Sequence, residues 1–453
     1  MNCPATLRAA AEKPEVVECR SGTVLGVAPD LFDDLRWRGL VYQVTDEVVG
    51  ARLAAGRQAV YHGMDATADS LHVGSLVGVV TLQRLQRAAH RPLALVGGGT
   101  TLIGDPSGRS TERQLLPPDR IEANVAGIRG QLERFLDFGS APSGAMLLNN
   151  ADWLAATPVT DFLRDVGKHF TVNAMMAKES VRSRLQDPDQ GLSFTEFSYM
   201  LLQSYDFLHL FDTYGCRLQI GGSDQWGNIT AGIDLVRRVR GEEAYGFTWP
   251  LVTRADGTKF GKSQGGNVWL DPARTSPYEF FQFWMATEDG DVGPYLRLLT
   301  FLDRAQIEAL EEEVRSHPGR RAAQRALATE LTVAVHGRDE AEKARRTSEA
   351  LFSGDLAGLD ERALVELFSD APSTTLARAR LEGDGVPLVE LLAASGLVAS
   401  RSAARQAITQ GGVSLNGHRE SDLDRRVVSA DLLAGGYLVM RRGRRSYHLI
   451  HAR

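Results

Sequence analysis

The feature that most constrains the fold is a strand–helix–strand pattern between residues 58 and 99. Residues 58–62 predict a short strand, and apolar residues after Asp69-Ser70 recur at helical spacing as far as about His90. Residues 92–96 form a continuous apolar run that ends in three glycines. This order predicts a βαβ unit, and therefore an α/β fold with a parallel sheet and helices on its faces.

The length of 453 residues is too great for one compact core and predicts two or three domains. No run approaches the roughly 18 apolar residues of a membrane span, and the first thirty residues lack the apolar segment of a secretory signal. The cysteines, at positions 3, 19 and 216, are scattered. A disulfide framework and a thiolate metal site are therefore not expected, and a reducing cytoplasm is the predicted location.

Composition changes along the chain and predicts its organisation. Residues 1–29 have no clear period and predict a loosely ordered extension. Residues 276–352 are rich in Ala, Glu and Arg and predict helices, whereas Gly, Asp, Ser and Pro are frequent over 353–385 and predict a linker. The tail, residues 386–453, holds ten Arg and five acidic residues within a chain whose net charge is −6. A basic tail fits a polyanionic partner, although a solvated surface explains the charge equally well.

Three polar or glycine-rich strand exits are candidate binding segments, because ligands of open α/β sheets bind beyond the carboxyl ends of the strands. They are residues 61–65, 97–108 and 221–225. The first precedes a helix that opens with His72-Val-Gly74, where unpaired N–H groups, the helix dipole and the imidazole suit a phosphate. An ordinary helix surface is the alternative for so short a pattern.

The segment Lys259-Phe-Gly-Lys262-Ser263 is a second candidate phosphate site. Only three residues separate Gly257 from Gly261, where a P-loop needs four, so that motif is excluded. The chain has six Lys against 45 Arg, yet two of the six lie here, which indicates a local need for flexible ammonium groups. Such groups can stabilise the charge on departing pyrophosphate, and the alternative is a basic surface turn.

Residues 193–207 predict a buried helix, because they are apolar on nearly every face. Tyr199, Gln203 and Asp206 fall at i, i+4 and i+7 and form one polar stripe on it. Burying these groups without partners costs several kcal/mol. They therefore bond either to one another and the core, or to a polar ligand.

With these motifs in place, the chain from about Asp30 onward resembles the bacterial tyrosyl-tRNA synthetases, which are class I aminoacyl-tRNA synthetases. The most specific passages are residues 102–108 (LIGDPSG), 193–199 (SFTEFSY) and 219–228 (QIGGSDQWGN). His72-Val-Gly-Ser75 looks like the HIGH motif of that family, and residues 259–263 look like its KMSKS motif.

The resemblance implies a role for each matching residue. Tyrosine would be bound through its phenolic hydroxyl by Tyr61 and Asp206, through its ammonium group by Asp105, Tyr199 and Gln203, and near its carboxylate by Gln225. ATP would contact Asp65, Thr67, His72 and Gly74, with Gly222 and Asp224 at the ribose. Lys262, helped by Lys259 and Ser263, would hold the pyrophosphate, and Arg109 and Arg113 would be further mobile cations.

The resemblance also implies the domains and the reaction. A Rossmann-like catalytic domain would span 30–255, a KMSKS-type loop 256–275, an α-helical anticodon-side domain 276–352 and a ribosomal-protein-type RNA-binding domain 386–453. The chain would use ATP with Mg²⁺ and no dedicated protein metal site, activate tyrosine, and transfer it to the 3′-terminal adenosine of its tRNA. A homodimer is implied by resemblance alone.

The tail adds residue-level expectations for RNA. Residues 400–410 predict a capped helix with Arg401 and Arg405 on one face, followed by a strand and an Asn-Gly turn. This pattern resembles a small RNA-binding module of ribosomal proteins and bacterial tyrosyl enzymes. Phosphate contacts would come from these two residues and from Arg441, Arg442, Arg444 and Arg445.

Three positions depart from the family pattern, all on the ATP side. Ser75 stands where the HIGH motif ends in His, His62 stands where many members carry Cys, and Ala66 replaces a common Pro. We therefore expect active chemistry with altered ATP affinity. The rival interpretations are a tryptophan enzyme, an RNA-binding paralogue without activity, and a duplicate that resists a tyrosine-mimicking inhibitor. The sequence does not separate the last from a housekeeping enzyme.

Overall fold

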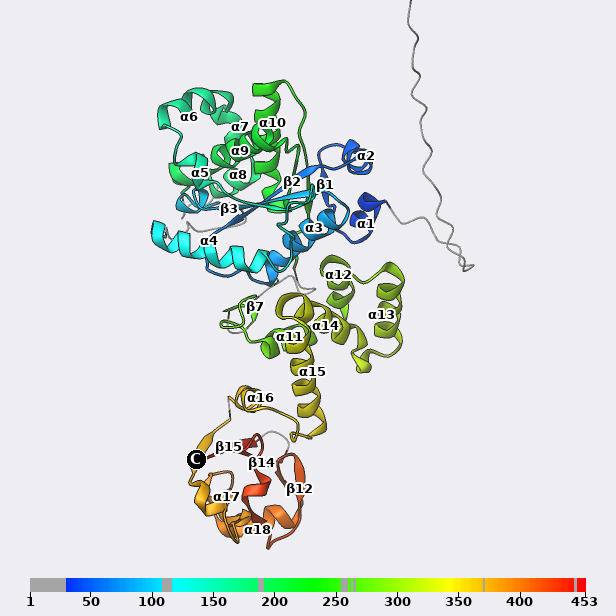
Figure 1. Ribbon diagram of the computed structural model, residues 1–453, viewed down its shortest axis with the longest axis vertical. Coiled ribbons are helices and arrows are strands. Elements are labelled where there is room, and N and C mark those ends of the chain that lie inside the picture. The colour runs from blue at the N-terminus through cyan, green and yellow to red at the C-terminus, as the bar shows by residue number, and fades with distance from the viewer. Residues whose placement is uncertain are drawn as a thin grey trace, which may run out of the picture.

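The structure is a computed structural model that describes residues 30–107, 116–185, 191–253, 260, 262–263, 266–369, 371–443 and 446–453. Three units follow one another along the longest axis of the molecule (Figure 1). They are the catalytic unit, named after the catalytic domain expected there, within residues 30–253, the helical unit within 277–353 and the C-terminal unit within 361–453. The expected extension over residues 1–29 lies outside the described residues. Within them, no helix combines the length and the apolar character that crossing a membrane requires.

The catalytic unit is built on a six-stranded sheet of order β1-β6-β5-β2-β3-β4, in which β1 is antiparallel and all other pairs are parallel. Its strands are β1 (Gln43–Val44), β2 (Ala59–Asp65), β3 (Arg91–Gly97), β4 (Met146–Asn149), β5 (Leu218–Gly222) and β6 (Tyr245–Trp249). The chain leaves β2 towards β3 and β4, and later returns through β5 and β6 on the other side. The strand order therefore reverses between β2 and β5, where ligands of such sheets bind.

Helices cover both faces of this sheet (Figure 1). One face carries α3 (Leu76–Arg87) and α4 (Pro118–Leu132), and the other carries α5 (Ala151–Leu154), α6 (Val159–Asp165), α7 (Val172–Met176), α8 (Glu179–Leu185), α9 (Phe194–Tyr214) and α10 (Trp226–Arg240). The short helices α1 (Leu31–Trp37) and α2 (Val48–Ala55) lie near β1. The predicted βαβ unit is confirmed as β2, α3 and β3, although α3 begins at Leu76 because residues 73–75 form a 3₁₀ turn first.

The helical unit confirms the predicted helices of residues 276–352. It comprises α11 (Pro277–Met285), α12 (Asp289–Leu299), α13 (Arg304–Ser316), α14 (Ala322–His336) and α15 (Arg338–Ser353). The expected break at 317–319 is a 3₁₀ turn over Pro318–Arg320. Two short strands, β7 (Lys262–Ser263) and β8 (Gly266–Asn267), precede this unit and pair with each other.

The C-terminal unit is a five-stranded sheet of order β12-β11-β14-β15-β9 with helices packed against it. Its elements are α16 (Glu361–Leu367), β9 (Ser373–Leu376), β10 (Val386–Pro387), α17 (Leu388–Ala394), α18 (Arg401–Thr409), β11 (Val413–Leu415), β12 (His418–Glu420), β13 (Arg426–Val427), β14 (Tyr437–Arg442) and β15 (Ser446–Ala452). The predicted cap is confirmed, since Ser400 accepts a hydrogen bond from Ala403 N. The Asn416-Gly417 turn has positive φ at both residues, as a tight hairpin requires.

The prediction of a linker over residues 353–385 is wrong. This segment contains α16 and β9, and β9 forms the edge of the C-terminal sheet by pairing in parallel with β15. The Gly, Asp, Ser and Pro residues that suggested a linker include caps and turns instead, such as Gly354 at the end of α15 and Asp360 at the start of α16. The C-terminal unit therefore begins well before Val386.

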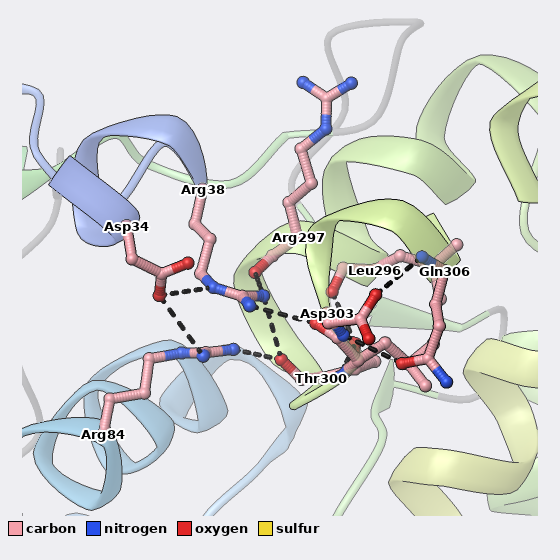
Figure 2. Close-up of polar contacts among 9 residues, drawn as sticks. Asp34, Arg38, Arg84, Leu296, Arg297, Thr300, Asp303 and Gln306 are labelled. Atoms are coloured by element: carbon pink, nitrogen blue, oxygen red, sulfur yellow. Dashed lines mark hydrogen bonds and ion pairs between the residues drawn. The ribbon is translucent and has the colours of Figure 1, made fainter. Parts of the chain in front are cut away.

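A buried arginine joins the catalytic unit to the helical unit at the carboxyl end of α12 (Figure 2). Arg38 is 6% exposed and donates to the carbonyl oxygens of Arg297, Thr300 and Leu302 at 3.0–3.3 Å. Its Nε donates to Asp34 Oδ2 at 2.8 Å, and Arg84 donates to the same Thr300 carbonyl. Cations suit this position because the last carbonyls of a helix lack partners and carry its negative dipole end.

Replacing Arg38 by Met should therefore lower the free energy of unfolding by about 2–4 kcal/mol, because three carbonyls and the Asp34 carboxylate lose a buried donor. Chemical denaturation measures this change. Arg36→Met on the same helix is the matched control, because the ion pair of Arg36 with Glu47 is exposed and should contribute less than about 1 kcal/mol. Equal losses of unfolding free energy in the two variants would contradict the stabilising role of the buried Arg38 contacts.

Candidate active site

The site lies at the carboxyl ends of β2, β3, β4 and β5, beside α9. Of the three predicted exits, 61–65 is the end of β2, 97–108 begins with the last residue of β3, and 221–225 begins with the last two residues of β5; residue 108 lies outside the described residues. A fourth exit was missed: β4 ends at Asn149, and Asn150 and Trp153 follow it. The signal was present in the sequence, because the apolar run 146–148 leads directly into two asparagines.

Tyr61 and Asp206 are the most deeply buried predicted site residues, each 1% exposed. Asp206 Oδ1 accepts a hydrogen bond from Trp153 Nε1 at 2.7 Å, and Oδ2 accepts one from Asn150 Nδ2 at 2.9 Å. Burial raises the pKa of Asp206 to about 7. Burial, and next the charge of Asp206, raises the pKa of Tyr61 well above its ordinary value. The two side chains are a buried acceptor and a buried donor, which suits a hydroxyl group.

Asn150 is a positioning residue that the sequence analysis missed. Its Nδ2 donates to Asp206 and also to Thr100 Oγ1 at 2.9 Å, while its Oδ1 accepts from Gly99 N at 2.8 Å. One amide thus ties α9 to the glycine-rich loop after β3.

A second cluster surrounds Asp105, which is 6% exposed. Its Oδ2 accepts from Gln225 Nε2 at 2.8 Å and its Oδ1 accepts from Ser107 N at 2.9 Å. Asn228, which the sequence analysis did not single out, donates to Gln225 Oε1 at 3.1 Å. The predicted residues Asp105 and Gln225 are therefore brought together, and their carboxylate and amide suit the charged ends of an amino acid.

The polar stripe on α9 is buried, as predicted. Tyr199 is 6% exposed and its hydroxyl donates to Asp65 Oδ1 at 3.2 Å. Gln203 is 7% exposed, and among the described residues no donor reaches its Oε1. Each Asp206 oxygen thus has one partner in the core and can accept a second donor, whereas Gln203 Oε1 has none of the described residues as a partner. Since Asp65 and Tyr199 touch, the residues assigned to ATP and to tyrosine lie against each other.

His72 is held as a neutral hydrogen-bond donor at the start of α3. Its Nδ1 accepts from Gly74 N at 3.0 Å, which leaves the proton on Nε2. Burial lowers the pKa of His72, so the ring is neutral at pH 7. Gly74 has no room for a side chain, because a Cβ there would lie 2.7 Å from Cε1 of this ring.

The HIGH-like segment and the residue before it pair, through their backbones, with the chain that follows the KMSKS-like segment. Val73 N donates to Val268 O at 3.0 Å, and Leu270 N donates to Leu71 O at 2.9 Å. Phe260 packs against Tyr295 with ring centroids 4.9 Å apart, which anchors the loop on the helical unit. Lys259, Arg109 and Arg113 lie outside the described residues, and so does the side-chain placement of Lys262 and Ser263.

The remaining predicted ATP residues also lie at the edge of the sheet where the parallel strands have their carboxyl ends. Gly222 ends β5, and Asp224 follows in a 3₁₀ turn. Burial, and next the charge of Asp105, raises the pKa of Asp224. Thr67 is exposed in the loop after β2. This edge of the sheet thus carries acidic and amide groups, among them Asp224 and Gln225.

The predicted RNA contacts are on the C-terminal unit. Arg401 and Arg405 are exposed on α18, where Arg401 pairs with Glu390 at 3.4 Å. Arg442 is exposed at the end of β14, and Arg441 is partly buried and donates to Ser414 Oγ at 3.2 Å. Arg444 and Arg445 lie outside the described residues.

Comparisons with known proteins agree with this geometry. Residues 54–353 match the family model described as tRNA synthetases class I (W and Y), and residues 363–450 match the tyrosine–tRNA ligase SYY-like C-terminal domain. The tyrosine–tRNA ligase of Roseiflexus castenholzii is 54% identical over 93% of this chain and 99% of its own length. That of Bacillus caldotenax is 54% identical over the same shares.

Among solved structures, the C-terminally truncated mitochondrial tyrosyl-tRNA synthetase of Aspergillus nidulans superposes with a TM-score of 0.65 and 31% identity, covering 72% of this chain and 95% of that one. The corresponding enzyme of Coccidioides posadasii gives a TM-score of 0.62 at 30% identity, covering 70% and 92%. With a family model that spans most of its length and relatives this similar over nearly all of it, the chain belongs to the class I tRNA synthetases of the W and Y family.

Proposed function

We propose that this chain is a tyrosine–tRNA ligase. It joins L-tyrosine to ATP, releasing pyrophosphate, and then transfers tyrosine from the adenylate to the 3′-terminal adenosine of its tRNA. The observation that carries the tyrosine assignment is the burial of both Tyr61 and Asp206, with the Asp206 carboxylate held by Asn150 and Trp153. A hydroxyl-free side chain placed there would offer these buried polar groups no hydrogen bond.

Catalysis of the first step is positioning and charge stabilisation. The tyrosine carboxylate is itself the nucleophile, so no general base is needed. His72 donates from Nε2 to the phosphates, while Lys262, with Lys259, Ser263, Arg109 and Arg113, neutralises the departing pyrophosphate. Mg²⁺ arrives with ATP as part of the substrate. Asp105, Tyr199, Gln203 and Gln225 orient the amino acid, and Asp65, Thr67, Gly74, Gly222 and Asp224 contact ATP.

The second step uses the C-terminal unit. Arg401, Arg405, Arg441, Arg442, Arg444 and Arg445 contact tRNA phosphates, which fits the basic character of the tail. The scattered cysteines fit an enzyme of the reducing cytoplasm. Aminoacylation tests the proposal: with ATP and total tRNA, label from tyrosine should enter tRNA, and label from any other amino acid should not. Entry of tryptophan instead would contradict the tyrosine assignment.

The proposal includes a homodimer formed through the helices α6–α9. Six large apolar side chains are exposed between residues 159 and 194, among them Phe194 at 78% and Val159 at 69%, the others being Leu163, Val172, Met176 and Leu185. All six lie on the consecutive helices α6, α7, α8 and α9, which cover the same face of the sheet (Figure 1). Apolar surface concentrated in this way is typical of a subunit interface.

Replacing Phe194 by Asp should therefore convert the protein from dimer to monomer, because it places a charge in the apolar interface. Sedimentation velocity measures the change. Leu423→Asp is the control, since Leu423 is 43% exposed on the C-terminal unit and should leave the dimer intact. A monomeric wild-type protein at micromolar concentration would contradict the homodimer.

A further inference from the structure

The indole of Trp269 packs against the imidazole of His72. The two ring centroids lie 6.2 Å apart and the ring planes meet at 74°, which is an edge-to-face arrangement. The two residues are also opposite each other in an antiparallel bridge, between the hydrogen bonds from Val73 N to Val268 O and from Leu270 N to Leu71 O. Side chains of such a pair lie closer than those of a hydrogen-bonded pair. The segment that follows the KMSKS-like segment thus places an aromatic ring beside the imidazole assigned to the phosphates.

The hydrogen bond from Gly74 N does not by itself fix the direction of the His72 imidazole. Nδ1 accepts this bond at 3.0 Å, which selects the tautomer with the proton on Nε2. The ring can still pivot about the bond, and a pivot displaces the Nε2 donor. Since a displacement of about 1 Å can lower a rate by roughly 10²-fold, a second contact on the ring has consequences for catalysis.

Trp269 is itself held by its neighbours. The guanidinium carbon of Arg274 lies 3.5 Å from the centroid of the indole, a cation–π contact. Arg274 Nη1 donates to Asp69 Oδ1 at 2.7 Å, and Trp269 N donates to Thr275 Oγ1 at 3.0 Å. Asp69 lies three residues before His72 in the chain. The contacts therefore close a ring that begins and ends on the segment leading into α3.

We propose that Trp269 is a positioning residue for the activation step, and that its indole, held by Arg274, keeps the His72 imidazole directed at the phosphates of ATP. The inference rests on the proposed function, because it concerns the orientation of a group assigned to that reaction. Trp269 touches His72 rather than the substrate, and Arg274 acts through the indole.

Replacing Trp269 by Leu tests the positioning role, because it removes the aromatic ring and leaves an apolar side chain at a partly buried position. In tyrosine-dependent ATP–pyrophosphate exchange, kcat should fall about 10- to 100-fold, while the KM for tyrosine stays unchanged. Trp269→Phe retains an aromatic ring for both His72 and Arg274 and should recover most of the activity. We refer kcat to the sites that bind tyrosine, so that unfolded protein is not counted. A lower melting temperature with wild-type kcat per site would show that Trp269 only packs, and would overturn the proposal.

A double-mutant cycle shows whether Trp269 acts through His72. His72→Asn retains an acceptor for Gly74 N but has no donor at the position of Nε2. In this background Trp269→Leu should lower kcat by less than about twofold, because no imidazole remains to be positioned. Trp37→Leu is the matched control, since Trp37 is also partly buried and contacts a guanidinium, that of Arg304, but lies on α1; its kcat should equal that of the parent in both backgrounds. Equal losses from Trp269→Leu in the two backgrounds would refute the action through His72.

Arg274→Met separates an indirect role of the guanidinium from a direct one. It should lower kcat by about two- to fivefold in the wild-type background, the value of one cation–π contact, and have no effect in the Trp269→Leu background. A loss that persists without the indole, together with a higher KM for ATP, would instead identify Arg274 as a cation of the phosphates and contradict its role through Trp269. Absence of any tyrosine-dependent exchange by the wild-type protein would refute the proposed function. Normal wild-type exchange with an unaffected Trp269→Leu would refute this inference alone.

Discussion

Replacing Lys262 by Ala is expected to lower kcat for tyrosine-dependent pyrophosphate exchange by about 10²–10³-fold, the usual cost of removing one preorganised group that stabilises transition-state charge. The KM for ATP should change little, because the ammonium group acts on charge that develops as pyrophosphate leaves. The structure supports a role for the loop of residues 259–263 at the phosphates, because the chain that follows this loop pairs with the backbone beside His72.

The type of cation at position 262 also matters for catalysis. In a chain with 45 Arg and six Lys, a lysine at position 262 indicates that a compact, mobile ammonium group is required. Lys262→Arg should therefore recover only part of the activity. Lys343→Ala is the control, because Lys343 is exposed and pairs with Glu340 at 2.7 Å. A rise in the KM for ATP with kcat unchanged would show that Lys262 only binds the ground state.

Asp206→Asn is expected to lower kcat/KM for tyrosine by about 10- to 100-fold, the value of a hydrogen bond to a charged group. Activity with phenylalanine, which has no hydroxyl to donate, should not fall, so discrimination between the two declines by the same factor. Asp212→Asn is the matched control on α9, since Asp212 is exposed and paired with Arg240. An equal loss with both amino acids would show that Asp206 acts only on the fold.

The raised pKa of Asp206 predicts a pH dependence of tyrosine binding that the Asp206→Asn variant should lack. Burial raises the pKa to about 7, so below this pH the free site holds a protonated carboxyl that must lose its proton to accept the phenol with full strength. Tyrosine affinity of the wild-type protein should therefore rise as the pH increases from about 6 to 8. Asp206→Asn should lack this rise. Isothermal titration of tyrosine at several pH values measures it.

Parts of this account were predictable because they depend on local pattern. The period of residues 58–97 predicted the βαβ unit, and the spacing of Tyr199, Gln203 and Asp206 predicted a polar stripe on a buried helix. The rule that ligands bind at strand exits found three of the four segments that build the site. The fourth, at Asn149-Asn150, was missed because β4 is short and only partly buried.

The rest could not be predicted because it depends on contacts between distant residues. Arg38 meets Thr300 across 262 positions, and no period in the sequence indicates that contact. A Cβ on Gly78 would lie 2.2 Å from Nε2 of His62, a close approach that is visible only where β2 packs beside α3. The error over residues 353–385 has the same origin, since an edge strand such as β9 is defined by its partner β15 rather than by its own exposed residues.

The most direct test of the central claim is ATP–pyrophosphate exchange on the full chain without tRNA, measured with each of the twenty amino acids. The account predicts exchange with tyrosine alone, because only tyrosine offers a phenolic hydroxyl to the buried pair of Tyr61 and Asp206. Exchange with tryptophan instead would contradict the assignment of this pocket. No exchange with any amino acid by a folded protein would contradict the enzyme itself and favour an RNA-binding paralogue.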